Sequence, residues 1–112
     1  MKIAFGTSVL RKQQKAGRLD GIGRYAEELL RALVATPQLT IREFVHEDLA
    51  QSPAPRTIAA GPFGTQALGT LLLKRPFARS ERAFGDSVDI VHSPDHFIPC
   101  PQHIPVVATI HD

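Results

Sequence analysis

Short apolar runs that end in polar residues recur along this chain and alternate with longer, more polar segments. Runs of this kind lack helical spacing and are typical of buried parallel strands. They cover residues 2–7, 40–46, 89–93 and 105–112, with a shorter apolar stretch at 57–61. Strands that alternate with helices predict an α/β fold with an open, mostly parallel sheet and flanking helices, an incomplete Rossmann-like arrangement.

The predicted sheet also indicates where a ligand would bind. In open parallel sheets, ligands bind beyond the carboxyl ends of the strands, where the strand order reverses. We expect three segments to meet there: residues 8–20, which are predicted as a polar loop, residues 92–103, and the chain that follows His111.

An amphipathic helix is predicted within the stretch DGIGRYAEELLRAL, residues 20–33. Its apolar residues recur three and four positions apart and form one face: Ile22, Tyr25, Ala26, Leu29, Leu30 and Leu33. Asp20 is placed to cap the first turn, where backbone amides lack partners within the helix. Gly21 and Gly23 have no Cβ, so an anion can approach these amides, favoured by the helix dipole. Two interpretations stay open, a phosphate site or a plain tight turn.

The same glycines satisfy the dinucleotide-binding pattern G-x-G-x-x-A in GIGRYA. That pattern requires its first glycine immediately after a strand, whereas residues 8–20 separate Gly21 from the first strand. A generic phosphate site is therefore favoured over a nicotinamide or flavin site.

Prolines interrupt the middle of the chain. The segment QSPAPR at residues 51–56 is predicted as a connector that continues neither a helix nor a strand. Residues 63–84 have helical character, but Pro76 removes a backbone donor and clashes with the preceding turn. We therefore predict two short helices in this region.

Four of the five histidines lie near the end of the chain, close to Asp95 and Asp112: His92, His96, His103 and His111. The cluster suggests a metal site and hence a metal hydrolase as one function class. Pro94 lies between His92 and His96, so that pair should not share one helical face as zinc ligands would. No metal ligand and no metal cofactor are therefore predicted. The fifth histidine, His46, is interpreted as a solvent-exposed strand end.

Charge and composition exclude some partners. The chain has 13 Lys and Arg against 11 Asp and Glu, and a net charge of +2 is too small for nucleic-acid binding by bulk charge. Two local basic clusters are either solvated surface or contacts to an anionic acceptor or membrane: Arg11, Lys12, Lys15 and Arg18, and Lys74, Arg75, Arg79 and Arg82. The lone Cys100 is expected to be inert, which fits a reducing cytoplasm. Neither a secretory leader nor a membrane span is predicted.

Three features, taken in order, resemble the amino-terminal domain of retaining glycosyltransferases with the GT-B fold. This large group includes mannosyl and galactosyl transferases of cell-surface polysaccharides. The features are KIAFGT at 2–7, DGIGRYAEELLRAL at 20–33, and the pair DIVHSPDHFIP at 89–99 and IPVVATIHD at 104–112. The resemblance covers nearly the whole chain. It implies two Rossmann-like domains across a cleft, the first holding mainly the acceptor and the second the nucleotide sugar.

The resemblance also implies roles for individual residues. At Gly21 and Gly23 the backbone would approach the donor diphosphate, and His111 would contact the transferred sugar near the reaction centre. The acceptor side would be formed by Arg24, Tyr25, His92, Ser93 and Asp95.

The chain departs from this family in length, because it stops at Asp112. We expect residues 1–112 to be a truncated amino-terminal domain without the donor-binding domain, inactive alone because only one side of the cleft is encoded. The open edge of the strand at 105–112 should make this fragment self-associate. The complete enzyme is expected in the cytoplasm, including the inner face of the membrane, acting on a nucleotide sugar and a glycan or lipid-linked acceptor. The alternative is a non-enzymatic α/β module that binds a phosphorylated ligand at Gly21 and Gly23.

Overall fold

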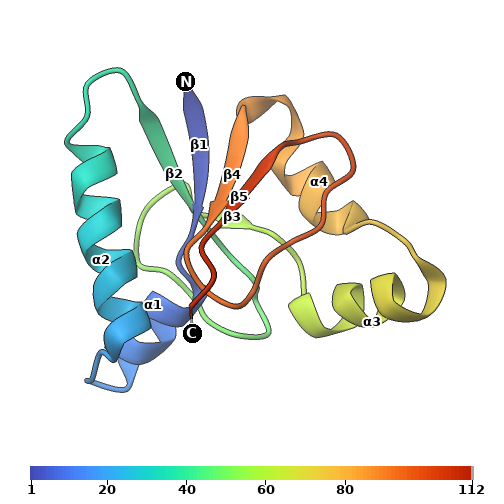
Figure 1. Ribbon diagram of the computed structural model, residues 1–112, viewed down its shortest axis with the longest axis horizontal. Coiled ribbons are helices and arrows are strands. Elements are labelled where there is room, and N and C mark those ends of the chain that lie inside the picture. The colour runs from blue at the N-terminus through green and yellow to red at the C-terminus, as the bar shows by residue number, and fades with distance from the viewer. Residues whose placement is uncertain (112) are drawn as a thin grey trace.

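A five-stranded sheet forms the centre of the computed structural model, which describes residues 1–111 (Figure 1). All neighbouring strands are parallel, in the order β3-β2-β1-β4-β5. The strands are β1 Lys2–Gly6, β2 Thr40–Val45, β3 Ile58–Ala59, β4 Ile90–Ser93 and β5 Val106–Ala108. The predicted open, parallel α/β sheet of Rossmann-like type is therefore confirmed.

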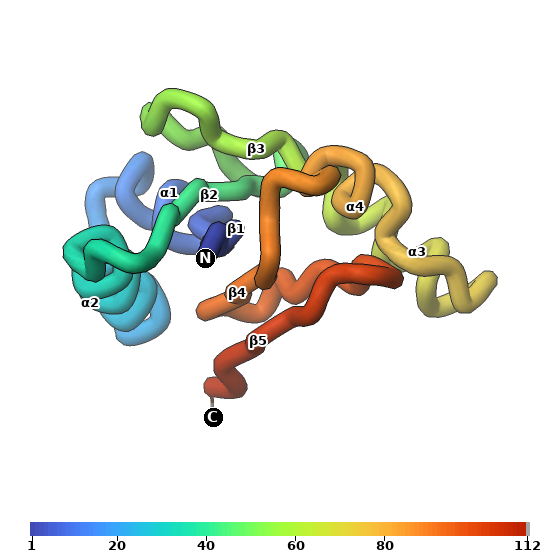
Figure 2. Tube along the Cα trace, turned by 90° about the horizontal axis from the view of Figure 1, so that it is seen from above, coloured from blue at the N-terminus to red at the C-terminus, as the bar shows by residue number. Residues whose placement is uncertain are grey.

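Helices lie on both sides of the sheet, as the view along the strands in Figure 2 shows. One side carries α1 and α2, and the other carries α3 and α4. The helices are α1 Ser8–Lys15, α2 Gly21–Val34, α3 Phe63–Leu73 and α4 Ala78–Phe84, followed by the 3₁₀ turn η1 Gly85–Ser87. The predicted pair of short helices separated at Pro76 is confirmed. Within residues 1–111, no helix combines the length and apolar character needed to cross a bilayer.

The main apolar core lies between the sheet and α4. Its buried members are Ala4, Phe44, Ile58, Ala60, Phe84, Val88 and Val91. The rings of Phe44 and Phe84 meet edge to face, with centroids 5.2 Å apart. Each such buried phenylalanine stabilises the fold by about 1.5–3 kcal/mol relative to an exposed one. The central strand β1 is covered on both faces, and Ala4 and Phe5 are fully buried.

Residues 8–20 differ from the sequence prediction of a polar loop, because residues 8–15 form helix α1. Val9 and Leu10 are the two aliphatic residues of this helix, and Leu10 is buried. So short an apolar pattern does not distinguish a helix from a loop. After α1 the chain turns at Gly17, whose φ of +78° is a left-handed conformation that suits glycine.

His46 also differs from its prediction, because it is fully buried rather than solvent-exposed. It directly follows β2, and its ring lies against Phe63 and Phe77, with centroid distances of 5.1 and 6.4 Å. Its Nδ1 atom lies 2.9 Å from the carbonyl oxygen of Gly61, so Nδ1 carries the proton and donates. Burial lowers the pKa of His46, which favours the neutral ring.

The strand order reverses between β1 and β4. From β1 the chain passes to β2 and β3 on one side of β1, and β4 then pairs with the other side. The carboxyl ends of β1 and β4 are therefore adjacent. Across this point the Val9 amide donates to Oδ2 of Asp95 at 3.4 Å, which ties the start of α1 to the loop after β4. This is the edge at which parallel sheets of this type bind ligands.

Candidate functional site

The first turn of α2 is organised by Asp20. Its Oδ1 atom accepts a hydrogen bond from the Gly23 amide at 3.0 Å, and its own amide donates to Oε1 of Gln13 at 3.1 Å. The Gly23 hydrogen bond is the main reason why the pKa of Asp20 is lowered. The predicted cap is thus present. It engages the Gly23 amide and also lies against the amide of Ile22, which leaves the Gly21 amide as the donor for an incoming anion.

The two glycines of this turn have different surroundings. A Cβ at Gly23 would lie 2.0 Å from Oε1 of Gln13 and 3.2 Å from Cδ2 of Leu19, whereas a Cβ at Gly21 would meet nothing within 4 Å. Gly23 therefore leaves room for the Gln13 side chain, whose Oε1 atom accepts from the Asp20 amide. Gly21 is exposed and leaves the backbone open to solvent.

His111 lies beside this helix start. Its ring meets Tyr25 edge to face with centroids 5.2 Å apart, and the His96 ring is 6.2 Å away. The segment is held in place by Thr109, whose hydroxyl lies 3.1 Å from the Tyr25 hydroxyl and whose amide donates to the carbonyl oxygen of Ser93 at 3.0 Å. The chain after β5 is thereby fixed against α2.

An open pocket of about 380 Å³ joins these elements, and it is lined by Asp20, Gly21, Ile22, His96 and His111. It brings together two residues that the sequence analysis singled out, Gly21 and His111. The contribution of His96 was missed, because this residue was weighed only as a metal ligand. The pocket combines the positive end of a helix and two imidazole rings with the Asp20 carboxylate; the helix end suits an anionic group on the side away from Asp20, and the rings suit hydroxyl groups.

The hydrogen bond of His111 fixes its protonation pattern. Its Nε2 atom lies 2.6 Å from the carbonyl oxygen of Pro94. A carbonyl oxygen only accepts, so Nε2 carries a proton and the neutral ring has its lone pair on Nδ1. In that state His111 offers an acceptor to a hydroxyl group.

Three predicted acceptor-side residues, His92, Ser93 and Asp95, are not among the residues that line this pocket in the described part of the chain. Asp95 is 2% exposed and accepts from the amides of Val9 and Phe97, while burial raises its pKa. His92 packs on Phe5 with ring centroids 5.4 Å apart, and burial lowers its pKa. Within residues 1–111, His92 Nε2 and the Ser93 hydroxyl are buried without a hydrogen-bond partner. Of these three side chains, Asp95 is the one whose hydrogen bonds hold the loop after β4.

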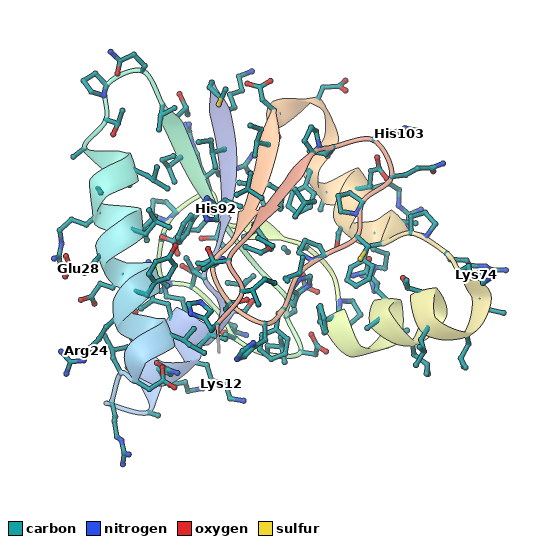
Figure 3. All side chains as sticks on the ribbon, viewed as in Figure 1. Lys12, Arg24, Glu28, Lys74, His92 and His103 are labelled. Atoms are coloured by element: carbon teal, nitrogen blue, oxygen red, sulfur yellow. The ribbon has the colours of Figure 1, made fainter. Side chains whose placement is uncertain are left out.

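The side chains of Arg24 and Tyr25 point in different directions from α2. Arg24 is exposed, and Figure 3 shows it pointing outward from α2, away from the sheet. Tyr25 instead reaches over the first turn toward Thr109 and His111. Of these two predicted acceptor-side residues, only Tyr25 is brought next to the pocket.

Residues 1–111 contain no group of three or more His, Cys, Asp or Glu side chains arranged to hold a metal ion. Asp112, which the sequence analysis placed beside His111 in the metal hypothesis, lies outside the described residues.

Comparison with known proteins gives no relative for this chain. No family model matches it, and neither the curated proteins nor the solved structures contain a match.

Proposed function

We propose that this chain forms the amino-terminal, acceptor-side part of a retaining glycosyltransferase that uses a nucleotide sugar. The observation that carries the proposal is the pocket in which the start of α2 and His111 meet. It lies at the carboxyl edge of a parallel sheet whose strand order reverses, where ligands bind in folds of this type.

The start of α2 is proposed to receive the donor diphosphate. The free amides at a helix N-terminus and the helix dipole attract phosphate, and they require no metal ion. Gly21 is the residue that permits close approach, because nothing lies within 4 Å of its missing Cβ. The Asp20 carboxylate competes with a phosphate for the helix amides, since it already accepts a hydrogen bond from the Gly23 amide. The phosphate is therefore proposed to approach on the Gly21 side.

His111 is proposed to contact the transferred sugar. Its Nε2 proton is engaged by Pro94, so the neutral ring offers Nδ1 as an acceptor for a sugar hydroxyl. A fixed imidazole beside the reaction centre contributes most when charge develops in the transition state. Tyr25, which is in edge-to-face contact with His111, would orient the ring on the acceptor side.

The proposed acceptor is a glycan or a lipid-linked glycan, and the proposed compartment is the cytoplasm. Ser93 and Asp95 would act on the acceptor by positioning the chain after β4 and after β5, and His92 lies on β4 directly before them. Three observations are consistent with this assignment: Asp95 ties that loop to α1, the Pro94 carbonyl orients His111, and the Ser93 carbonyl holds Thr109.

The direct test uses the full-length product of the gene that encodes this chain. The protein is incubated with a panel of nucleotide sugars and with glycan and lipid-linked acceptors, and sugar transfer is followed by mass spectrometry. We expect transfer from one donor, with the product keeping the anomeric configuration of the donor. Transfer with inversion, or hydrolysis of a phosphorylated substrate that depends on an added metal, would contradict the proposal.

The alternative of a non-enzymatic phosphate-binding module is separated by a second measurement. Inorganic phosphate and sugar phosphates are titrated into the same protein and into its Gly21→Val variant by calorimetry. Binding that Gly21→Val abolishes, without transfer from any donor, would favour the binding module over the transferase.

A further inference from the structure

Helix α3 exposes an unusual amount of apolar surface. None of its eleven residues is charged and none is buried. Leu68, Leu71, Leu72 and Leu73 have exposed fractions of 55, 79, 68 and 61%. A cluster of exposed apolar side chains is typical of a surface that contacts another protein or a membrane. The exposed leucines of α3 therefore form a surface that is suited to an apolar partner.

The amino-terminal end of α3 is anchored in the fold. The carboxylate of Asp48 accepts from the amides of Phe63 and Gly64 at 2.8 and 3.1 Å, and the Phe63 ring packs on Phe97 with centroids 5.1 Å apart. The carboxyl-terminal end extends away from the sheet at the periphery of the molecule (Figure 1). Leu71, Leu72 and Leu73 lie on this extended end, which together with Lys74 and Arg75 is called the tip of α3.

Basic residues follow the exposed leucines directly. Lys74 and Arg75 are both exposed, and Figure 3 shows Lys74 pointing outward at the tip. They line an open pocket of about 440 Å³ together with Cys100 and Gln102. Within the described part of the chain, no acidic side chain lines this pocket. Two further exposed cations, Arg79 and Arg82, lie on α4.

The nearby acidic residue Glu81 does not neutralise these cations through an ion pair among residues 1–111. Its two carboxylate oxygens instead accept from the amides of Gln102 and His103, at 2.7 and 2.8 Å. The tip of α3 therefore presents apolar side chains with positive charge immediately beside them.

We propose that the tip of α3 docks on an anionic lipid bilayer, with Leu71, Leu72 and Leu73 entering the interface and Lys74 and Arg75 binding lipid phosphates. Charge complementarity favours an anionic bilayer over a purely apolar partner, because only the bilayer offers negative groups that can pair with Lys74 and Arg75. Eleven residues are too few to span a bilayer, which takes about 20, so the helix would lie in the interfacial region. This docking does not depend on the proposed transferase activity.

The docked chain would hold its candidate site close to the membrane. Asp48, which caps α3, follows the carboxyl end of β2, at the same edge of the sheet as the pocket beside His111. If the proposed function is correct, a lipid-linked acceptor in the same bilayer would be presented to that edge.

Vesicle binding tests the proposal without an activity assay. The chain has no tryptophan, so Leu72→Trp supplies a single fluorescent reporter at the tip. The variant is mixed with vesicles of phosphatidylcholine alone or of an equal mixture of phosphatidylcholine and phosphatidylglycerol. We expect a blue shift and co-sedimentation with the anionic vesicles, and binding about fivefold weaker for each cation removed from the tip.

Paired variants of the chain without the reporter identify the residues responsible by co-sedimentation. Leu71→Glu combined with Leu72→Glu should weaken anionic-vesicle binding by about tenfold or more, because each leucine loses its burial. Lys74→Glu combined with Arg75→Glu should do the same. The matched controls are Val34→Glu, at an exposed apolar site on α2, and Lys12→Glu with Lys15→Glu on α1; both should bind as the unaltered chain does.

Three outcomes would overturn the proposal. The first is equal binding to neutral and anionic vesicles, and the second is unchanged binding by the Leu71 and Leu72 variant. The third is vesicle-independent association, detected by sedimentation and abolished by the same leucine substitutions, which would assign the tip of α3 to a second copy of the chain. Circular dichroism establishes that each variant is folded before it is compared.

Discussion

Nε2 of His111 lies 2.6 Å from the carbonyl oxygen of Pro94, so a residue after β5 is oriented by the loop that follows β4. The contact spans 17 residues of sequence and depends on the parallel pairing of the two strands, in which Ser93 is opposite Ala108. The orientation of the imidazole is therefore a consequence of the sheet register. A change in that pairing would move the ring relative to the start of α2.

We predict that His111→Ala in the full-length protein lowers kcat by about 100-fold, with a smaller effect on the acceptor KM. A group that stabilises developing charge acts mainly in the transition state, so its removal affects kcat more than ground-state binding. The measurement is the initial rate of sugar transfer at varied acceptor concentration, with circular dichroism to establish folding.

His111→Gln is the matched control for this prediction. Its amide nitrogen can still donate to the Pro94 carbonyl, but its acceptor is an amide oxygen that does not occupy the position of the imidazole Nδ1. We expect the loop to remain ordered and the rate to stay low. A glutamine variant with normal activity would assign His111 a purely structural role.

A second prediction compares the two glycines at the start of α2. Gly21→Ala should leave the thermal midpoint nearly unchanged, because its Cβ meets nothing within 4 Å, but it should weaken donor binding by crowding the amide. Gly23→Ala should lower stability by at most about 1 kcal/mol, because its Cβ displaces the flexible end of Gln13 and the hydrogen bond that Oε1 accepts from the Asp20 amide, while alanine favours the helix. Thermal unfolding and donor titration of both variants provide the measurements.

Combining Gln13→Ala with Gly23→Ala tests the assigned cause. Removing the glutamine side chain frees the space that the new Cβ requires, so the double variant should lose less stability than the sum of the two single variants. Additive losses would show that Gln13 is not the residue that demands glycine at position 23. Normal donor binding by Gly21→Ala would remove the phosphate role from this turn.

The sequence predicted the sheet well because the pattern that defines it is local. Residues such as Ile3, Ala4, Phe5 and Val91 lie in short apolar runs, and such runs are typical of strands that are buried on both faces. The proline at 76 likewise divides α3 from α4 through its own covalent structure. No partner far along the chain is needed for either inference.

The errors arose where long-range packing decides the outcome. His46 is buried because Phe63 and Phe77 cover it, and neither ring is close to it in sequence. Gly23 lies against the Gln13 side chain, which belongs to a helix whose apolar pattern was too short to recognise. The sequence indicated that a ligand site would lie at the carboxyl ends of the strands, and the pocket lies there. That His96 lines this pocket depends on the path of the loop after β4, which the sequence pattern does not show.

A third prediction concerns acid stability and follows from His46. Burial lowers its pKa below the ordinary value of 6.5, although Asp48, Asp95 and Glu47 act in the opposite direction. Below pH 6.5 the unfolded chain takes up a proton that the folded chain still excludes, so the free energy of unfolding should fall as the pH drops below that value. His92 adds to this effect, because burial lowers its pKa as well.

The measurement is urea unfolding between pH 7.5 and pH 5 for the unaltered chain and for His46→Asn. Asparagine keeps an N–H donor for the Gly61 carbonyl and does not titrate. We expect a shallower loss of stability on acidification in the variant. Asp95 has the opposite effect. Its pKa is raised above 3.8 in the folded chain, so as the pH falls toward 3.8 the folded chain takes up this proton before the unfolded chain does, and the free energy of unfolding rises. An unchanged slope in His46→Asn would contradict the assignment.

The last prediction concerns the outer edge of β5. In the sheet formed by residues 1–111, β5 is a terminal strand that pairs only with β4, and Val107 and Ile110 are 48% and 78% exposed. An apolar strand edge with free backbone groups is a template for pairing with a second chain. Residues 1–112 should therefore self-associate, and Val107→Lys should shift sedimentation toward the monomer because lysine opposes edge pairing. Leu72→Glu serves as the matched control, since it removes a comparably exposed apolar side chain at the tip of α3 and should leave this association intact. A monomer over a wide concentration range, or an effect of Leu72→Glu equal to that of Val107→Lys, would show that β5 is not the associating edge.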